Sequence, residues 1–553
     1  MSDCRRGPRI GAMLRLVVAC SVLRGPLAFR DSVPKSSPPR RVAPWRRPRA
    51  FMTATLDSVD AAFLEAEAFK EEDEEERAPA ATSRAREWFD GALAAAGGAR
   101  ESAAVAAARA AGADALGRAA LPLKKQEPWR FTNLEHLWRT SVDARGAPAG
   151  VGEAALAGWV PDEASGEAVV VVVDGVVDEA LSRACGYGAG DATWCGSIAA
   201  APDEVLGDVA AAFAALPEFD LEETMPMRNR LGAGCWCALN AACAGDGVVV
   251  WAREDAAAAA AAAARDDDGA RVAAGGGAAA PARLHVVHVR SAGATGVLHP
   301  RTVVHVGDGA RVALRESFVA VGPAAEKRSR LTNARTNCRV GAGGVLTHVL
   351  DSQEADQVHV HHVQCGVRRD GEFMSRAISD GAAVGRVAVE AEILGPHARF
   401  DFLGLQLGAG DQNLDLRTAL RHTAGDAESV QDIRNVAGER AKLTFKGRIA
   451  VPVTGQKTNA DQICKSLLLD DGATVDAMPS LEIVADDVKC THGATIADLD
   501  EEGLFYLNSR MLSEKDARKL LLKAFCYDIV QRTDLLPPAT VDRLDAKLSQ
   551  LTV

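Results

Sequence analysis

From Leu284 to about Asp498, short apolar segments rich in β-branched residues alternate with turns in which a small residue, usually alanine, follows a glycine, a histidine or an arginine. Each such turn places a small residue at a corner before the next strand begins. No helical stretch separates the segments, which argues against a βαβ sheet and leaves a β-solenoid or a long sandwich. The turns that carry the pattern are Gly309-Ala-Arg-Val312, Gly343-Gly-Val-Leu346, Gly381-Ala-Ala-Val384, His397-Ala-Arg-Phe400, Arg440-Ala-Lys-Leu443 and Gly472-Ala-Thr-Val475.

Helical patterns lie on both sides of this β-rich body. The Ala-rich stretch from Ala54 to Arg118 is helical in character, and the chain becomes helical again after Asp498. Ser513-Glu-Lys-Asp516 has the form of a capping box, which predicts that a helix begins there. An apolar stripe is expected behind it, and the chain's own body is its default docking surface. The predicted stripe consists of Leu520, Leu521, Ala524, Phe525 and Val530.

Composition agrees with many closely packed strands. The 553 residues are too many for one ordinary core, and 48% of them are apolar although only 5% are aromatic. The net charge is −12, and the folded part holds no Lys/Arg-rich block, which argues against nucleic acid as a partner. The 12 cysteines are scattered along the chain, as expected for reduced thiols in a reducing compartment.

The N-terminal segment predicts a targeting leader. Residues 1–50 carry twelve lysines and arginines against Asp3 and Asp31, and an apolar core runs from about Met13 to Leu23. A signal peptide followed by a basic, acid-poor transit segment is typical of proteins sent to a complex plastid. The apolar core is too short for a membrane anchor, and no other run suggests stable membrane insertion. We therefore expect delivery to the plastid stroma.

The shifts in pattern divide the chain into four parts. We expect a leader over 1–53, a helical and mixed domain over 54–280, a β core over 281–498 and a C-terminal helical domain over 499–553. The Ala/Gly-rich stretch Ala256–Ala280 is predicted to be an inserted surface loop.

Cys490 and His492, near the end of the β-rich region, are the strongest candidate site. Residues at i and i+2 of a strand point to the same face, so a thiol and an imidazole would lie side by side. That pair of ligands suits iron or zinc better than calcium or magnesium. The alternative is that Cys490 is a small buried apolar residue and His492 a satisfied turn residue.

These residues lie in the part of the chain that resembles a known family. The stretch from Thr444 through Cys490-Thr-His-Gly-Ala494 to Arg510, together with Glu127-Pro-Trp-Arg-Phe-Thr132, closely resembles SufD, of the SufB/SufD family of iron–sulfur cluster assembly proteins. The resemblance implies a mainly β fold, with a right-handed parallel β-helix flanked by N-terminal and C-terminal helical domains. It also implies a non-enzymatic scaffold subunit.

The same resemblance implies the partners. A SufB-like subunit would pair through the β-helix, a SufC-like ATPase would bind the C-terminal helices, and a transient iron–sulfur cluster would form at the interface with SufB. His492 would be an interface ligand or proton-transfer group, and Cys490 a neighbouring thiol. Cys464 falls where SufB has its cluster-building cysteine. It is a candidate third residue for the nascent cluster if this chain retains an extra thiol, and otherwise, as we expect, it is inert. Gly455-Gln-Lys-Thr458 is not a P-loop, so no nucleotide site is expected in this chain.

Weaker patterns leave alternatives. His359 and His361 would share one strand face and His362 the other, and we expect ordinary β-helix surface there in preference to a metal site. Cys235, Cys237 and Cys243 lack the spacing of a zinc knuckle.

The sequence leaves two alternative functions. A SufB-like cluster-building subunit would use Cys464, but the sequence Thr491-His-Gly493 argues against it. A polysaccharide-active β-helix could use Asp486 and Asp487, but adjacent strand residues point to opposite faces.

Overall fold

The computed structural model describes the chain in several stretches, which are residues 78–96, 102–124, 126–142, 151–160, 166–183, 192–216, 231–263, 280–321, 330–355, 357–533 and 535–551. Contacts divide the chain into a unit of Met1–Ser83 and a unit of Arg84–Val553, and the second unit holds both sheets. The predicted leader over 1–53 lies outside the described residues, as does the 264–279 part of the predicted insertion. The earlier part of that insertion is helix α9, Ala256–Ala263.

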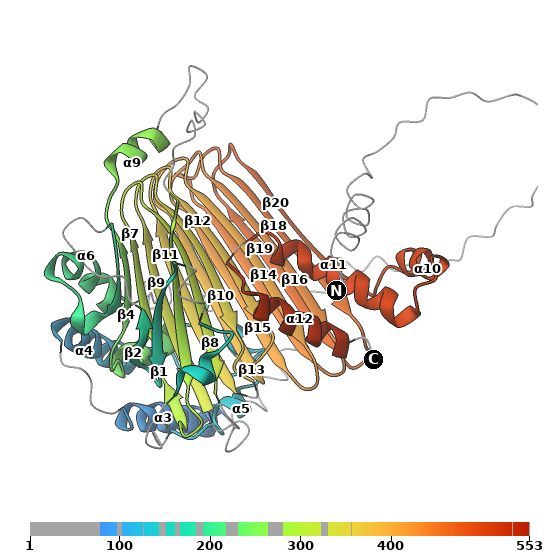
Figure 1. Ribbon diagram of the computed structural model, residues 1–553, viewed down its shortest axis with the longest axis horizontal. Helices are drawn as coiled ribbons and strands as arrows, with labels where there is room; N and C mark the ends of the chain where they lie inside the picture. The colour runs from blue at the N-terminus through green and yellow to red at the C-terminus, as the bar shows by residue number, and fades with distance from the viewer. Residues whose placement is uncertain are drawn as a thin grey trace, which may run out of the picture. The chain divides into compact units, whose positions relative to one another are not determined.

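Within the described residues, the strands form two ten-stranded sheets (Figure 1). The first sheet contains, in spatial order, β2 (Val176–Arg183), β1 (Ala168–Val173), β5 (Ala282–Arg290), β8 (Arg311–Ala320), β10 (Val345–Ser352), β12 (Glu372–Ser379), β14 (Arg399–Gly408), β16 (Glu428–Ala437), β18 (Asn459–Leu468) and β20 (Lys489–Ala497). The second contains β19 (Thr474–Ile483), β17 (Lys442–Val451), β15 (Asn413–His422), β13 (Val384–Ile393), β11 (Val358–Val367), β9 (Arg330–Val340), β7 (Arg301–Val306), β4 (Val248–Ala252) and β3 (Thr193–Ser197), with β6 (Gly296–Leu298) paired to β9.

The order of the strands defines a parallel β-solenoid. From β8 onward, successive strands alternate between the two sheets, and each pairs in parallel with the strand two places further along the chain. The register is continuous; for example, all ten residues of β11 face consecutive residues of β13. The prediction of a parallel β-helix with helices at both ends is confirmed.

The corners explain why the turn pattern predicted this fold. Ala398, Ala441 and Ala473 lie just before β14, β17 and β19 and are at most 6% exposed, so a larger side chain has no room there. Gly309 takes a φ of +73°, and a Cβ atom on it would lie 2.2 Å from the carbonyl oxygen of Asp255. The alternation of strands and small corner residues in the sequence therefore corresponds to the turns of the solenoid.

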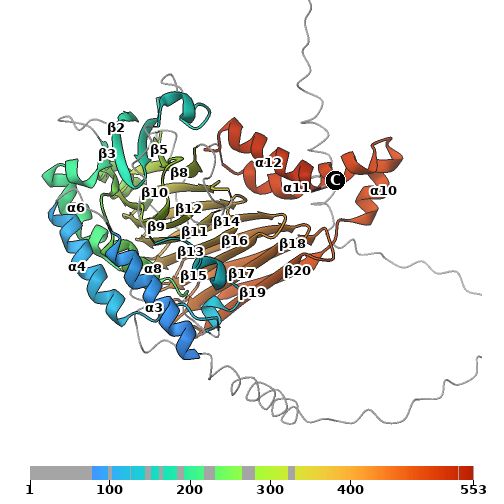
Figure 2. The same ribbon diagram turned by 90° about the horizontal axis from the view of Figure 1, so that it is seen from below.

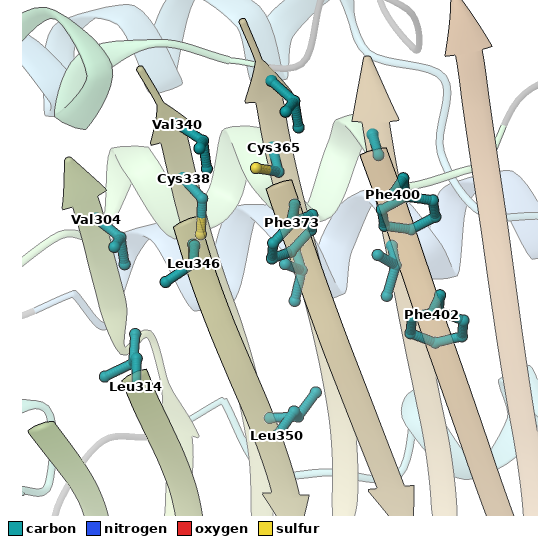
Figure 3. Packing of buried hydrophobic residues seen from close by; sticks show 14 of the residues in the cluster. Val304, Leu314, Cys338, Val340, Leu346, Leu350, Cys365, Phe373, Phe400 and Phe402 are labelled. Atoms are coloured by element: carbon teal, nitrogen blue, oxygen red, sulfur yellow. The ribbon is translucent and has the colours of Figure 1, made fainter. Parts of the chain in front are cut away.

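The interior of the solenoid is apolar along most of its length. Phe373 of β12 lies beside Phe400 of β14, with ring centroids 5.6 Å apart, and Phe402 follows Phe400 along β14, with ring centroids 6.2 Å apart (Figure 3). Each fully buried side chain of this size stabilises the fold by about 1.5–3 kcal/mol. Cys338 and Cys365 face each other in the same core, as neighbours across β9 and β11.

N-terminal helices and short turns lie before and between the first strands, and helices α6 and α8 contact β7 and β9 (Figure 2). The α-helices are α3 (Ala78–Ala94), α4 (Ala103–Arg118), α5 (Leu134–Leu137), α6 (Asp203–Ala214) and α8 (Gly234–Ala242). The 3₁₀ turns are Glu127–Trp129, Glu153–Leu156 and Ile198–Ala200. No helix within the described residues is long and apolar enough to cross a membrane.

Three helices follow the last strand, namely α10 (Glu501–Ser509), α11 (Glu514–Val530) and α12 (Pro538–Gln550). The predicted capping box is confirmed, because the Ser513 hydroxyl accepts a hydrogen bond from the Asp516 amide at 3.2 Å. The predicted apolar stripe is partly wrong. Val530 is buried, and Leu521 and Phe525 are partly buried against the same cluster. The other fully buried positions of α11 are Ala517, Leu522, Cys526 and Ile529, which were not predicted.

Candidate functional site

The candidate pair lies on the last strand of the solenoid. Strand β20 ends the first sheet and pairs only with β18 among the described strands, so its other edge is uncovered there. Cys490 stands beside Ala460, and His492 stands beside Gln462. Ala460 and Gln462 are fully buried inside the solenoid. Because directly aligned residues of a parallel sheet point the same way, Cys490 and His492 also face the interior side.

The prediction that these two side chains share a face is confirmed, and both lie in a strand. Cys490 is half-buried and contacts the solenoid core, whereas His492 is exposed. Burial raises the pKa of the Cys490 thiol, with a smaller opposing effect from a backbone hydrogen bond at Ala460. The alternative that His492 is a turn residue is wrong, since it lies in the middle of β20.

Cys464 occupies the inner face of the neighbouring strand β18. It is fully buried and stands beside Ala494, two residues from His492 along β20. The Asn435 amide donates to its sulfur at 3.4 Å. Burial raises the pKa of the Cys464 thiol to about 11, so the group is protonated at neutral pH.

Apolar side chains are also exposed where the solenoid ends. Val451, in β17, is fully buried, but Ile483, its neighbour in β19, is 42% exposed. Ile496 in β20 is 46% exposed, although Ser466 beside it in β18 is buried. These exposed positions would be interior if another turn of solenoid followed. We call the uncovered inner face and edges of β19 and β20 the open end.

No group of three or more His, Cys, Asp or Glu side chains in the described residues is arranged to hold a metal ion. The histidine alternation in β11 is as predicted, but the expectation of solvent-exposed surface there is wrong. The His359 Nδ1 donates to the Glu354 carboxylate at 2.9 Å, and the His361 Nε2 lies 2.9 Å from the Thr336 hydroxyl; both pairs lie inside the solenoid. His362 is 3% exposed on the opposite face, where its Nε2 lies 3.2 Å from Glu390.

Two further predicted features can be located in the structure. Cys235, Cys237 and Cys243 are buried in or at the end of α8. Asp486 and Asp487 lie in the exposed turn between β19 and β20, so the assumption that they are strand residues is wrong.

The N-terminal motif Glu127–Thr132 was predicted only through a family resemblance. In the structure it packs against the solenoid. The Arg386 guanidinium of β13 lies 3.9 Å from the centre of the Trp129 ring. The Thr132 hydroxyl donates to Asp415 of β15 at 2.8 Å. Asp415 is buried, which by itself raises its pKa, but Arg417 and Arg386 outweigh that effect and hold the pKa below its usual value. The motif therefore fixes an N-terminal segment onto the second sheet.

Comparison with known proteins agrees with this architecture. Residues 288–525 match the family described as SUF system FeS cluster assembly, SufBD core domain. An iron–sulfur cluster assembly SufBD family protein of Synechocystis sp. is 26% identical over 435 residues, which cover 77% of this chain and 87% of the relative.

Two other relatives match over a shorter stretch. The chloroplastic protein ABCI7 of Arabidopsis thaliana is 31% identical over 239 residues, covering 43% of this chain and 50% of its own length. The iron–sulfur cluster assembly protein SufD of Escherichia coli is 29% identical over 249 residues, covering 45% of this chain and 58% of its own length. The match thus spans little more than half of these two relatives. With its SufBD core domain folded as a parallel β-solenoid, the chain belongs to the SufB/SufD family of iron–sulfur cluster assembly proteins.

Proposed function

We propose that this protein is the SufD-type scaffold subunit of a SUF assembly complex. It pairs with a SufB-like subunit at the open end, holds a SufC-like ATPase on its C-terminal helices and contributes His492 and Cys490 to a transient cluster. The observation that carries the proposal is the uncovered last turn of the solenoid, where this pair and the exposed apolar Ile496 lie on the inner face of the same strand.

The edges of β19 and β20 favour a partner with strands of its own. An uncovered strand edge carries unpaired backbone donors and acceptors, which another chain can complete by adding a strand. Ile483 and Ile496 would become interior on such pairing, as their in-register neighbours already are. A second SufBD-family solenoid offers the matching strands, so we assign a SufB-like chain to this surface.

The ligand chemistry fits a shared cluster. Thiolates hold iron–sulfur clusters, and imidazole replaces them in some centres. This chain would supply an imidazole from His492 and a thiol from Cys490, while the partner supplies the remaining ligands. A site divided between two chains can open when the subunits move, which permits release of the cluster. The fully buried Cys464 thiol is assigned no ligand role.

The C-terminal helices are the proposed site for the ATPase. Helix α10 exposes Phe505 and Tyr506 at 76% and 47%, and Met511 behind it is 93% exposed. Exposed aromatic and methionine side chains of this kind mark a surface for a protein partner. This chain itself would then act without catalysis and without bound nucleotide. We place it in the plastid stroma, because its relative from Arabidopsis thaliana is chloroplastic and its leader reads as a plastid signal.

Co-expression tests the proposal directly. The chain from Ala54 onward would be produced with the SufB-like and SufC-like proteins of the same organism and analysed by anaerobic size exclusion with mass detection and iron and sulfide assays. His492→Ala should preserve the complex and lose the cluster. Thr495→Ala is the matched control, because Thr495 is exposed on the same strand but points to the opposite face.

Each outcome separates the parts of the proposal. Failure to form a complex with wild-type protein would refute the scaffold assignment. A complex in which His492→Ala builds as much cluster as Thr495→Ala would retain the scaffold and remove His492 from the site.

A further inference from the structure

Two side-chain amides form a ladder inside the solenoid, next to the open end. Gln431 of β16 and Gln462 of β18 stand side by side in the register of the first sheet, and each is at most 1% exposed. The Gln462 Nε2 donates a hydrogen bond to the Gln431 Oε1 at 3.1 Å. The Thr418 hydroxyl donates to the same oxygen at 2.7 Å. These two bonds fix which end of each amide faces which neighbour.

The second sheet leaves room for this amide ladder. Gly447 of β17 lies against it, and a Cβ atom on Gly447 would lie 2.2 Å from the Gln462 Nε2. Any other residue at this position would therefore displace the amide. The nitrogen end of Gln462 is thus held in place, by its hydrogen bond on one side and by the packing of the opposite sheet on the other.

In a ladder of this kind each amide directs its nitrogen toward the preceding turn and its oxygen toward the following one. Behind Gln431 stands Phe402 of β14, which cannot accept a hydrogen bond, and the Gln431 Nε2 accordingly has no partner in the described part of the chain. At the other end of the ladder, the buried Gln462 Oε1 has no partner among these residues either. The residue that stands next in line is His492 of β20.

An N–H group of the His492 ring would satisfy this oxygen. A buried acceptor without a donor keeps the full cost of its removal from water, so a donor beside it is favoured. Adjacent strands of a sheet are about 4.8 Å apart, which places the His492 ring within reach of the amide next to it. The ring is exposed and makes no hydrogen bond to another described residue, so it can turn about χ1 and χ2 without breaking one.

We infer that Gln462 is the positioning residue of His492, because its Oε1 accepts a hydrogen bond from one ring nitrogen and thereby fixes the tautomer of the imidazole. The other ring nitrogen then carries a lone pair and is left for a ligand at the open end. Histidines that bind metal ions almost always donate their second ring N–H to a neighbouring group. The ligand role of His492 rests on the proposed function, whereas its orientation by Gln462 rests on the amide ladder.

The tautomer of His492 in the free chain tests this orientation. The full chain would carry nitrogen-15 in its histidine rings, and two-bond proton–nitrogen correlations at pH 8.5, where an ordinary imidazole is neutral, would report which ring nitrogen holds the proton. The signal that disappears in His492→Ala identifies the residue. The ratio of its two tautomers should differ at least threefold from that of a histidine model peptide in the same buffer. An equal ratio in wild-type protein overturns the inference without any variant of Gln462.

Two buried glutamines give a matched comparison. Gln462→Met removes the acceptor and should bring the tautomer ratio to that of the model peptide. Gln406→Met is the control, because Gln406 is also buried with an Oε1 that lacks a partner among the described residues, but it lies in β14, three strands from β20 in the first sheet. This control should keep the ratio of wild type. Circular dichroism would check folding, and a wild-type ratio in folded Gln462→Met contradicts the inference.

The co-expressed complex tests the consequence for the cluster. Gln462→Met should keep the mass of the complex and lower its bound iron and sulfide about tenfold relative to Gln406→Met, as expected when a group that orients a metal ligand is lost. Equal iron and sulfide in the two variants would remove the positioning role. If wild-type protein forms no complex, the proposed function fails, while the tautomer ratio of the free chain still decides whether Gln462 orients His492.

Discussion

Asp415→Asn is expected to loosen the attachment of the N-terminal segment to the solenoid. The Asp415 carboxylate accepts hydrogen bonds from Thr132 at 2.8 Å and from Arg417 at 3.0 Å, and it also pairs with Arg386. All three partners are buried. The substitution keeps the shape of the side chain but removes the negative charge that faces two buried guanidinium groups.

The expected loss is large because both cations stay buried. Removing one partner of a buried ion pair typically costs about 3–5 kcal/mol in the free energy of unfolding. The unit from Arg84 to Val553 has ~470 residues, and an unfolding entropy of about 2.1 cal/mol/K per residue converts this loss into a fall in melting temperature of about 3–5 °C. The matched control is Asp411→Asn, which breaks an exposed pair with Arg440 and should not change the melting temperature measurably.

Scanning calorimetry as a function of pH tests the electrostatic origin. The folded pKa of Asp415 is below its usual value, so its contribution is complete above about pH 3.9 and is lost as the pH falls through the folded pKa. The difference between wild type and Asp415→Asn should therefore be constant near neutral pH and narrow in acid. A melting temperature within about 1 °C of wild type at pH 7 would refute the reasoning, as would a difference that does not narrow.

Two further predictions concern single side chains. In the isolated chain, iodoacetamide should modify the half-buried Cys490 while the buried Cys464 is protected, as peptide mass spectrometry would measure; equal modification would contradict the closed interior next to the open end. Burial lowers the pKa of His422 from 6.5 to about 4, so its neutral form stabilises the fold above about pH 6.5 and this contribution is lost as the pH falls through about 4. The free energy of unfolding, measured with urea, should therefore fall less for His422→Gln than for wild type as the pH falls from 6.5 to 4. An equal fall in the two proteins would contradict the assignment.

The solenoid could be predicted because its corners are a local requirement. A tight corner admits only a small residue. Ala398, Ala441 and Ala473 therefore mark turns of the solenoid independently of contacts made by distant parts of the chain. The partners of the early strands are not local in this way. Val248–Ala252 joins the second sheet by pairing with β7, and nothing in its own sequence indicates which strand lies beside it. The same limit explains the error on α11, whose buried line depends on where β14 meets it.

The features of the candidate sites also differ in whether they depend on local geometry or on distant parts of the chain. A shared face for Cys490 and His492 follows from strand geometry alone, whereas the exposure of His492 depends on β20 being the last strand of its sheet. The hydrogen bond from Thr132 to Asp415 could not be predicted, because the two residues lie far apart along the chain and meet only through the packing of the N-terminal segment on the second sheet.

The two ends of the solenoid differ in a way that restricts how it can assemble. At the first end, β2 and β3 run antiparallel to β1 and β4, which interrupts the parallel hydrogen-bonding pattern. At the other end, β19 and β20 keep the parallel direction and register of all the preceding turns. An edge strand can accept a further strand in either direction, but only the β19 and β20 end continues the parallel ladder of the solenoid. A partner that extends the solenoid in parallel therefore matches the end that carries His492, which is where we propose that the SufB-like chain binds.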